Sequence, residues 1–184
     1  MLNIQNWESI KADDGSFKRL EAGCYQCVVK NVETRNSRSG KPMLVIAFDI
    51  MGGEYDGYFM DLYAKNVENA HQDGKQAKWP NGGVFYQLLD DDHLPRFKAV
   101  IEAIEASNPG YKFNMDEKSL KDKVFGGVMR EEEYESQRDG SIKTTVRCDR
   151  VVPVSKIETT KVPDCKRLKK SAEQKAIDST EIPF

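Results

Sequence analysis

Cationic side chains and aromatic rings occur together at several places along the chain. The loop at 35–42, RNSRSGKP, contains three cations and no acid, and the segment 65–87 contains lysines close to Trp79 and Tyr86. Positive side chains follow the phosphates of an unpaired polynucleotide while rings stack on its bases, at about 1 to 3 kcal/mol per stack. The predicted backbone contacts are Arg35, Arg38, Lys41, Lys78, Arg138, Lys143 and Arg147, and the predicted stacking residues are Phe59, Tyr63, Trp79 and Tyr86.

Each of these residues also has a purely structural interpretation. A basic loop is more often simply solvated, and aromatic residues of strands more often belong to the core. Trp79-Pro80 is equally compatible with a packing plug beneath its loop. The sequence therefore names these residues as candidates and leaves the structural alternative open.

Enzymatic chemistry has weaker support. The carboxylate runs at 90–92 and 131–133 are conceivable metal ligands of a nuclease, but neighbouring residues rarely converge on one ion, and the first run is explained as a helix cap. His71 and His93 have no Ser, Cys or metal partner at a telling spacing. We therefore predict a binding protein without cofactor or metal, with a metal-dependent nuclease as an alternative.

Hydrophobic periodicity predicts the elements that must position these residues. The predicted elements are strands at 24–35, 43–50 and 55–64, a long irregular loop at 65–87, a helix at 94–107, and strands at 124–134 and 141–152. Asp139-Gly140 predicts a hairpin turn between the last two strands. Gly126-Gly127 indicates a bulge or sharp bend in the fourth strand.

This order of elements is that of the OB-fold, a mostly β five-stranded Greek-key barrel with a helix between strands three and four. An SH3-like barrel or a small α+β sandwich shares the pattern. OB barrels bind oligonucleotides or oligosaccharides across strands two and three, between the loops that here are 34–42 and 135–141. The predicted organisation is an N-terminal arm at 1–23, the barrel domain at 24–153 and a flexible tail at 154–184.

Composition limits the size of the domain, the cellular location and the roles of the cysteines. The 184 residues suit one domain with tails, and the net charge of −2 neither requires nor excludes nucleic acid, because binding depends on where cations cluster. A long hydrophobic run is lacking and the start does not read as a signal peptide, so we expect a cytoplasmic protein without membrane contact. The four cysteines lack framework or zinc spacing and are expected to be small buried hydrophobes.

The chain ends on DSTEIPF, which packing explains poorly. A terminal Phe184 can fill an apolar pocket on another protein while its carboxylate meets a cation at the rim. The ending resembles the C-terminal tip of bacterial single-stranded-DNA-binding proteins, although it has fewer acids than that family commonly has. The resemblance implies partner binding by Asp178, Glu181, Ile182, Pro183 and Phe184, with recruitment of replication, recombination and repair enzymes.

A narrower resemblance extends over nearly the full length. GSFKRLEAGCYQCVVKNVE, FDIMGGEYDGYFMDLY, KWPNGGVFYQ, LPRFKAVIEAIEASNPGYKF and the EEEYE hairpin are similar to single-stranded-DNA-binding proteins encoded by phages and prophages of Gram-positive bacteria. The resemblance implies sequence-tolerant binding and protection of single-stranded DNA during phage DNA replication or recombination. A protein-interaction or carbohydrate-binding barrel is the alternative, and a homo-oligomer stays open.

Overall fold

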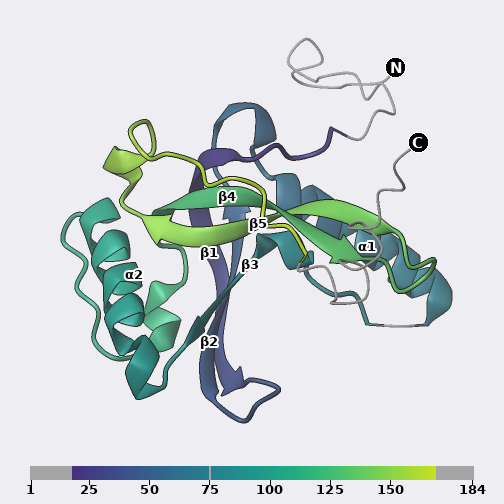
Figure 1. Cartoon of the computed structure of the whole chain (residues 1–184). Helices are drawn as coiled ribbons and strands as arrows, with labels where there is room; N and C mark the ends of the chain where they lie inside the picture. Colours follow the sequence, from purple (N-terminus) through teal and green to yellow (C-terminus); the bar gives the residue numbers. More distant parts are fainter. Residues whose placement is uncertain (1–17, 75, 169–184) are drawn as a thin grey trace, which may run out of the picture.

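The computed structural model describes residues 18–74 and 76–168. Its centre is a five-stranded antiparallel sheet in the order β3-β2-β1-β4-β5 (Figure 1). The strands are β1 (Gly23–Asn36), β2 (Pro42–Ile50), β3 (Val84–Leu88), β4 (Val124–Glu135) and β5 (Ile142–Val152). Two α-helices, α1 (Tyr58–Asp73) and α2 (Leu94–Ser107), accompany the sheet, with short 3-10 turns between the elements.

The long central strand β1 lets the sheet bend. Its first half pairs with β4, from Gly23 opposite Met129 to Val28 opposite Val124, and most of its length pairs with β2. The β1–β2 register shifts between Val29 and Asn31, which is the irregularity that a bulge produces, and bulges bend a strand. In Figure 1, β4 and β5 accordingly run across the direction of β1 and β2.

The core fills the concave side of this bent sheet. The ring of Phe48 packs edge-on against the rings of Phe59 and Phe125, with ring centroids 5.5 Å apart in both pairs. Helix α2 adds a buried face that includes Val100 and Ile104, as its predicted apolar period requires. Strand, helix and loop residues thus share one hydrophobic core.

The two outer strands of the sheet are β3 and β5, and no hydrogen-bonded ladder joins them in the described part of the chain. They approach each other through the turn that precedes β3, because a Cβ placed on Gly82 would lie 3.1 Å from the carbonyl oxygen of Val146. The predicted mostly β fold, with five antiparallel strands and a helix before the fourth, is confirmed. The predicted closure into a barrel is not: the sheet is unclosed.

The predicted third strand at 55–64 is wrong, because that segment forms the start of α1. Gly57 precedes the helix in the left-handed conformation, with φ of 73°. The buried carboxylate of Asp49 accepts a hydrogen bond from the backbone N–H of Phe59 at 2.9 Å, which satisfies a donor of the first turn. Phe59 and Leu62 then face the core at helical spacing.

The predicted irregular loop at 65–87 is also wrong over much of its length. Helix α1 continues through Asp73, and the true third strand is β3, in which Phe85 and Gln87 are buried and Tyr86 between them is exposed. The strands predicted at 24–35, 43–50, 124–134 and 141–152, the helix at 94–107 and the turn at Asp139-Gly140 are confirmed.

Part of the predicted flexible tail lies within the described part of the chain. Residues 154–168, placed in a flexible tail by composition, are described, and Lys166 forms a parallel bridge with Glu132 of β4. From the predicted N-terminal arm, Leu20 is buried against the core. The rest of the arm, at 1–17, and the tip residues Asp178, Glu181, Ile182, Pro183 and Phe184 lie outside the described residues.

Replacing Asp49 by alanine is expected to lower the free energy of unfolding by about 1 to 2 kcal/mol, because the N–H groups of Ile50 and Phe59 lose their buried acceptor. Asp49→Asn keeps a side-chain oxygen at the same place and is expected to lose less. Urea titration of both variants measures the difference. Equal losses in the two variants would contradict the capping role of the oxygen.

Candidate nucleic-acid interface

A polar cavity lies where the two edge strands β3 and β5 face each other. Its volume is about 350 Å³. Four of its lining side chains are cations and two are acids, and they come from β4, β5, α2 and the C-terminal segment. The lining residues are Val84, Phe85, Tyr86, Arg96, Arg130, Glu132, Arg147, Cys148, Asp149 and Lys166.

One half of the cavity is held rigidly by Asp149. The Arg130 guanidinium lies 2.7 Å from the Asp149 carboxylate, and both side chains are about three-quarters buried. Arg96 of α2 donates a hydrogen bond to the Asp149 backbone carbonyl at 2.8 Å, which leaves the Arg96 charge without a carboxylate in this contact. These contacts fix two guanidinium groups at the seam between the strands.

The other half is organised by Glu132. Its carboxylate lies 2.6 Å from the Lys166 ammonium and 3.9 Å from the Arg147 Nε. One carboxylate therefore serves two cations, both of which remain about half exposed. The cavity has an excess of positive charge, and a partly enclosed site of one sign attracts the opposite charge. An anion is the ligand that this lining favours.

An exposed ring borders the cavity. Tyr86 is 40% exposed on the outer face of β3. The Arg35 guanidinium lies 5.9 Å from the centre of the Tyr86 ring, within cation–π range, and its Nη1 is 3.4 Å from the Glu33 carboxylate. The ring offers a flat surface to a base, and the adjacent guanidinium offers a charge to its phosphate.

The loop between β1 and β2 presents its cations unequally. Arg38 is exposed at the turn. Lys41 lies 2.6 Å from the Asp90 carboxylate, just before α2. The hydrogen bond from Lys41, with a further contribution from His93, lowers the pKa of Asp90 below its usual range. Lys41 therefore ties the loop to the start of the helix, and Arg38 is the available cation.

The β4–β5 turn also has one exposed cation and one cation that is paired with an acid. Arg138 is exposed. The Lys143 ammonium lies 3.3 Å from the Asp139 carboxylate, and the Ser141 hydroxyl donates a hydrogen bond to the same carboxylate at 2.7 Å. Hydrogen bonds, that of the Ser141 side chain first, lower the pKa of Asp139 to about 2, so the acid stays charged and holds Lys143 in the turn.

The structure removes one predicted stacking residue. Phe59 is only 2% exposed and belongs to the core, so the prediction that it stacks on a base is wrong. Its position in a helix rather than a strand is the reason, because the first turn of α1 directs the ring against Phe48.

Tyr63 of α1 and Trp79 lie together, and neither lines the cavity. Their ring centroids are 5.3 Å apart, and the Trp79 Nε1 donates to the Gly83 carbonyl at 3.0 Å. Trp79 packs against the core, as the packing alternative proposed. Lys78 is exposed next to it, and its carbonyl accepts a hydrogen bond from Asn66. Of the predicted residues, only Tyr86 and Arg147 line the cavity, and Arg35 contacts the Tyr86 ring.

Three cavity cations were missed by sequence reasoning. Arg130 lies directly opposite Arg147 in the β4–β5 ladder. A two-residue turn at Asp139-Gly140 would instead place Arg130 diagonal to Arg147 on the same face, so alternation across the predicted hairpin was the signal that could have identified it. Arg96 belongs to a helix and has no local sequence pattern that marks it. Lys166 opens the basic run KRLKK at 166–170 in the predicted tail, and that run was the available signal.

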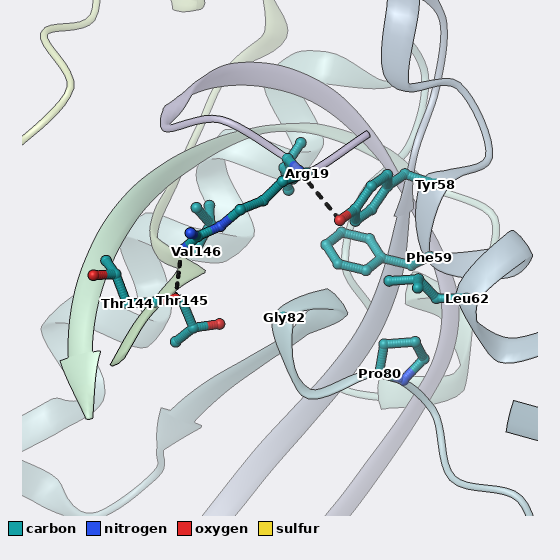
Figure 2. A pocket seen from close by; sticks show the side chains of 10 residues that line it. Arg19, Tyr58, Phe59, Leu62, Pro80, Gly82, Thr144, Thr145 and Val146 are labelled. Carbon is teal, nitrogen blue, oxygen red and sulfur yellow. Dashed lines mark hydrogen bonds between the residues drawn. The ribbon is translucent and has the colours of Figure 1, made fainter. Parts of the chain in front are cut away.

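A second cavity, of about 370 Å³, lies between α1 and β5 and is mainly apolar. Figure 2 shows Tyr58, Phe59 and Leu62 on one side and Thr144, Thr145 and Val146 on the other, with Arg19 reaching across. Arg19 donates a hydrogen bond to the Thr144 carbonyl, and the Leu20 N–H donates to the Tyr58 hydroxyl at 3.2 Å. One engaged cation over an apolar lining does not suit a phosphate backbone.

The carboxylates of the two acidic runs do not gather into one metal-holding cluster in the described part of the chain. Asp90 is paired with Lys41 and His93, while the strand backbone alternates the side chains at 131–133 between two faces. Over residues 18–74 and 76–168, no group of three or more metal-ligating side chains lies close enough to hold an ion. Neither described helix is both long and apolar enough to cross a membrane.

Comparison with known proteins gives one partial match. Residues 6–82 match a family model described as "Protein of unknown function (DUF669)". The matched span ends before β3, so it includes Arg35 but not Tyr86 or Arg147. No curated protein matches the chain. The chemistry of the cavity is therefore the main guide to function.

The cavity cysteine is expected to be chemically inert. Cys148 is partly exposed, but desolvation raises the pKa of its thiol to about 12. Burial raises the pKa of the Cys27 thiol well above its ordinary value, so neither forms appreciable thiolate at pH 8. Iodoacetamide at pH 8 should modify partly exposed Cys165 fastest and Cys24 more slowly, as measured by peptide mass mapping. All four should react in denaturant. Native labelling of Cys148 as fast as that of Cys165 would contradict this assignment.

Proposed function

We propose that the protein binds single-stranded DNA without sequence preference, on the outer face of β3 and across the seam to β5. The observation that supports this best is the convergence of Arg96, Arg130, Arg147 and Lys166 beside the exposed ring of Tyr86. Cations that exceed the neighbouring acids attract a phosphodiester backbone, and an open ring stacks on a base of any identity.

We further propose that the sheet is an OB-fold barrel with an open seam. Its strand order, the long β1 that pairs with both β2 and β4, and the helix α2 between the third and fourth strands agree with that fold, which is often only partly closed. Helix α1 is then an insertion between strands two and three. The OB ligand surface at strands two and three contains Tyr86, and its flanking loops contribute Arg38 and Arg138.

The biological setting follows from the sequence resemblance and stays a proposal. The protein would protect exposed strands during phage or prophage DNA replication or recombination. The C-terminal tip, with Ile182, Pro183 and Phe184 behind two acids, would recruit replication, recombination or repair enzymes.

A fluorescence titration of labelled oligo-dT and of a duplex of equal length tests the function. We expect tighter binding of oligo-dT, and about four phosphate contacts would lower its affinity roughly 50-fold between 50 mM and 200 mM salt. Removal of residues 178–184 should leave this titration unchanged while abolishing retention of replication enzymes. An affinity that does not change with salt concentration would support a carbohydrate or protein ligand instead. Degradation of DNA in the presence of a divalent metal would support a nuclease.

A further inference from the structure

The C-terminal segment 165–168 occupies a strand position in the sheet. Pairing between β1 and β4 ends at Gly23 and Met129, so the following part of β4 has a free edge on that side. There the Lys166 N–H donates to the Glu131 carbonyl at 2.8 Å, and the Glu133 N–H donates to the Lys166 carbonyl at 2.9 Å. The segment extends the sheet at the edge that β1 leaves.

Side-chain contacts fix the same segment. The Lys166 ammonium lies 2.6 Å from the Glu132 carboxylate, and the Leu168 N–H donates to the Glu133 carboxylate at 3.1 Å. Lys166 thereby lines the seam cavity together with Arg147 and Tyr86. In Figure 1 the yellow end of the described chain lies near β5 and β3. Arg167 follows as an exposed cation.

Building on the proposed function, we propose that segment 165–168 forms one wall of the DNA-binding surface and contacts the phosphodiester backbone through Lys166, while the exposed Arg167 next to it adds positive charge to the segment. Backbone hydrogen bonds to β4 hold these cations in place before the strand arrives, so less conformational entropy is lost on binding than with a free tail. The binding domain therefore extends to at least Leu168.

The test compares two charge-matched double variants of the full chain. Lys166→Ala with Arg167→Ala removes the proposed contact and the neighbouring positive charge. Lys156→Ala with Lys161→Ala removes two exposed lysines of the same C-terminal region that do not line the cavity. The first variant is expected to bind oligo-dT about 10-fold more weakly at 100 mM salt, with a shallower salt dependence. The second should stay within about twofold of the parent chain.

Equal affinities of the two variants, in a chain that binds oligo-dT, would overturn this inference and leave the proposed function standing. A parent chain that does not bind oligo-dT would overturn both. Thermal melting of each variant checks that the sheet remains intact, and the conservative Lys166→Arg change should retain affinity.

Cys165 provides a readout that needs no substitution at a charged position. It precedes Lys166 and is a free, partly exposed thiol, and Cys24 on β1 serves as an internal reference. Saturating oligo-dT is expected to slow alkylation of Cys165 at least about threefold relative to Cys24, because a bound strand covers the segment. An unchanged ratio of the two labelling rates at saturation would overturn the proposed wall.

Discussion

Tyr86→Ala is expected to weaken binding of oligo-dT by about 5- to 150-fold, which corresponds to about 1 to 3 kcal/mol for one lost base stack. The ring is 40% exposed and lies beside the Arg35 guanidinium on the outer face of β3. Its removal takes away the flat surface while leaving the cavity charges in place. The salt dependence of binding should therefore remain that of the parent chain, because no phosphate contact is lost.

The matched control for this prediction is Tyr86→Phe, which keeps the ring and is expected to stay within about twofold of the parent affinity. Because Tyr86 stands on a short edge strand, urea titration of both variants must show that Tyr86→Ala costs no more than about 1 kcal/mol of stability. A full-strength complex with the alanine variant would remove Tyr86 from the binding surface.

Elements with a clear period of their own were predictable from the sequence. Strands β1, β2, β4 and β5 and helix α2 each contain enough alternating or helical repeats to decide their type locally. Helix α1 does not, because its start is decided by Gly57 and by a carboxylate from β2, Asp49, which accepts from Phe59. A contact between distant residues therefore determines that a segment with strand-like alternation is helical.

Strand β3 was not predicted because it, too, depends on contacts with another part of the chain. Its five residues follow a glycine-rich turn and are too few to establish an alternation by themselves. Pairing with β2, from Ala47 opposite Val84 to Met43 opposite Leu88, makes them a strand. Since this strand supplies Tyr86, the sequence indicated the residue and its chemistry while the element that presents it depended on tertiary structure.

The grouping of charged residues at the candidate site also depends on tertiary structure and was not predictable from the sequence. Arg147 was predicted from its own strand, but its partner Glu132 and its neighbour Arg130 come from β4, and Lys166 comes from a segment whose composition reads as a tail. Composition reports the number of cations, whereas the sheet register decides which of them meet. That is why a chain of net charge −2 can still contain a cavity with an excess of positive charge.

Reversing the charge of Arg147 is expected to have a large effect on binding. In Arg147→Glu a second carboxylate would stand near Glu132, which lies 3.9 Å from the native guanidinium, and both would repel a phosphate backbone. We expect affinity for oligo-dT to fall on the order of 30-fold at 100 mM salt. Lowering the salt concentration should not reduce this difference in affinity from the parent chain. Arg147 is partly exposed, so the fold should tolerate the change.

The double variant Arg147→Glu with Glu132→Arg tests whether affinity depends on the number of charges around the cavity or on their positions. It restores the number of cations and acids around the cavity while exchanging their places on β4 and β5. A surface that holds a phosphate backbone by its positive potential, without reading sequence, should regain affinity to within about threefold of the parent chain. The swap also removes the carboxylate that pairs with Lys166. A swap variant as weak as Arg147→Glu would mean that the positions of these charges, including the Lys166–Glu132 pair, decide affinity, which is incompatible with purely electrostatic capture at this end of the cavity.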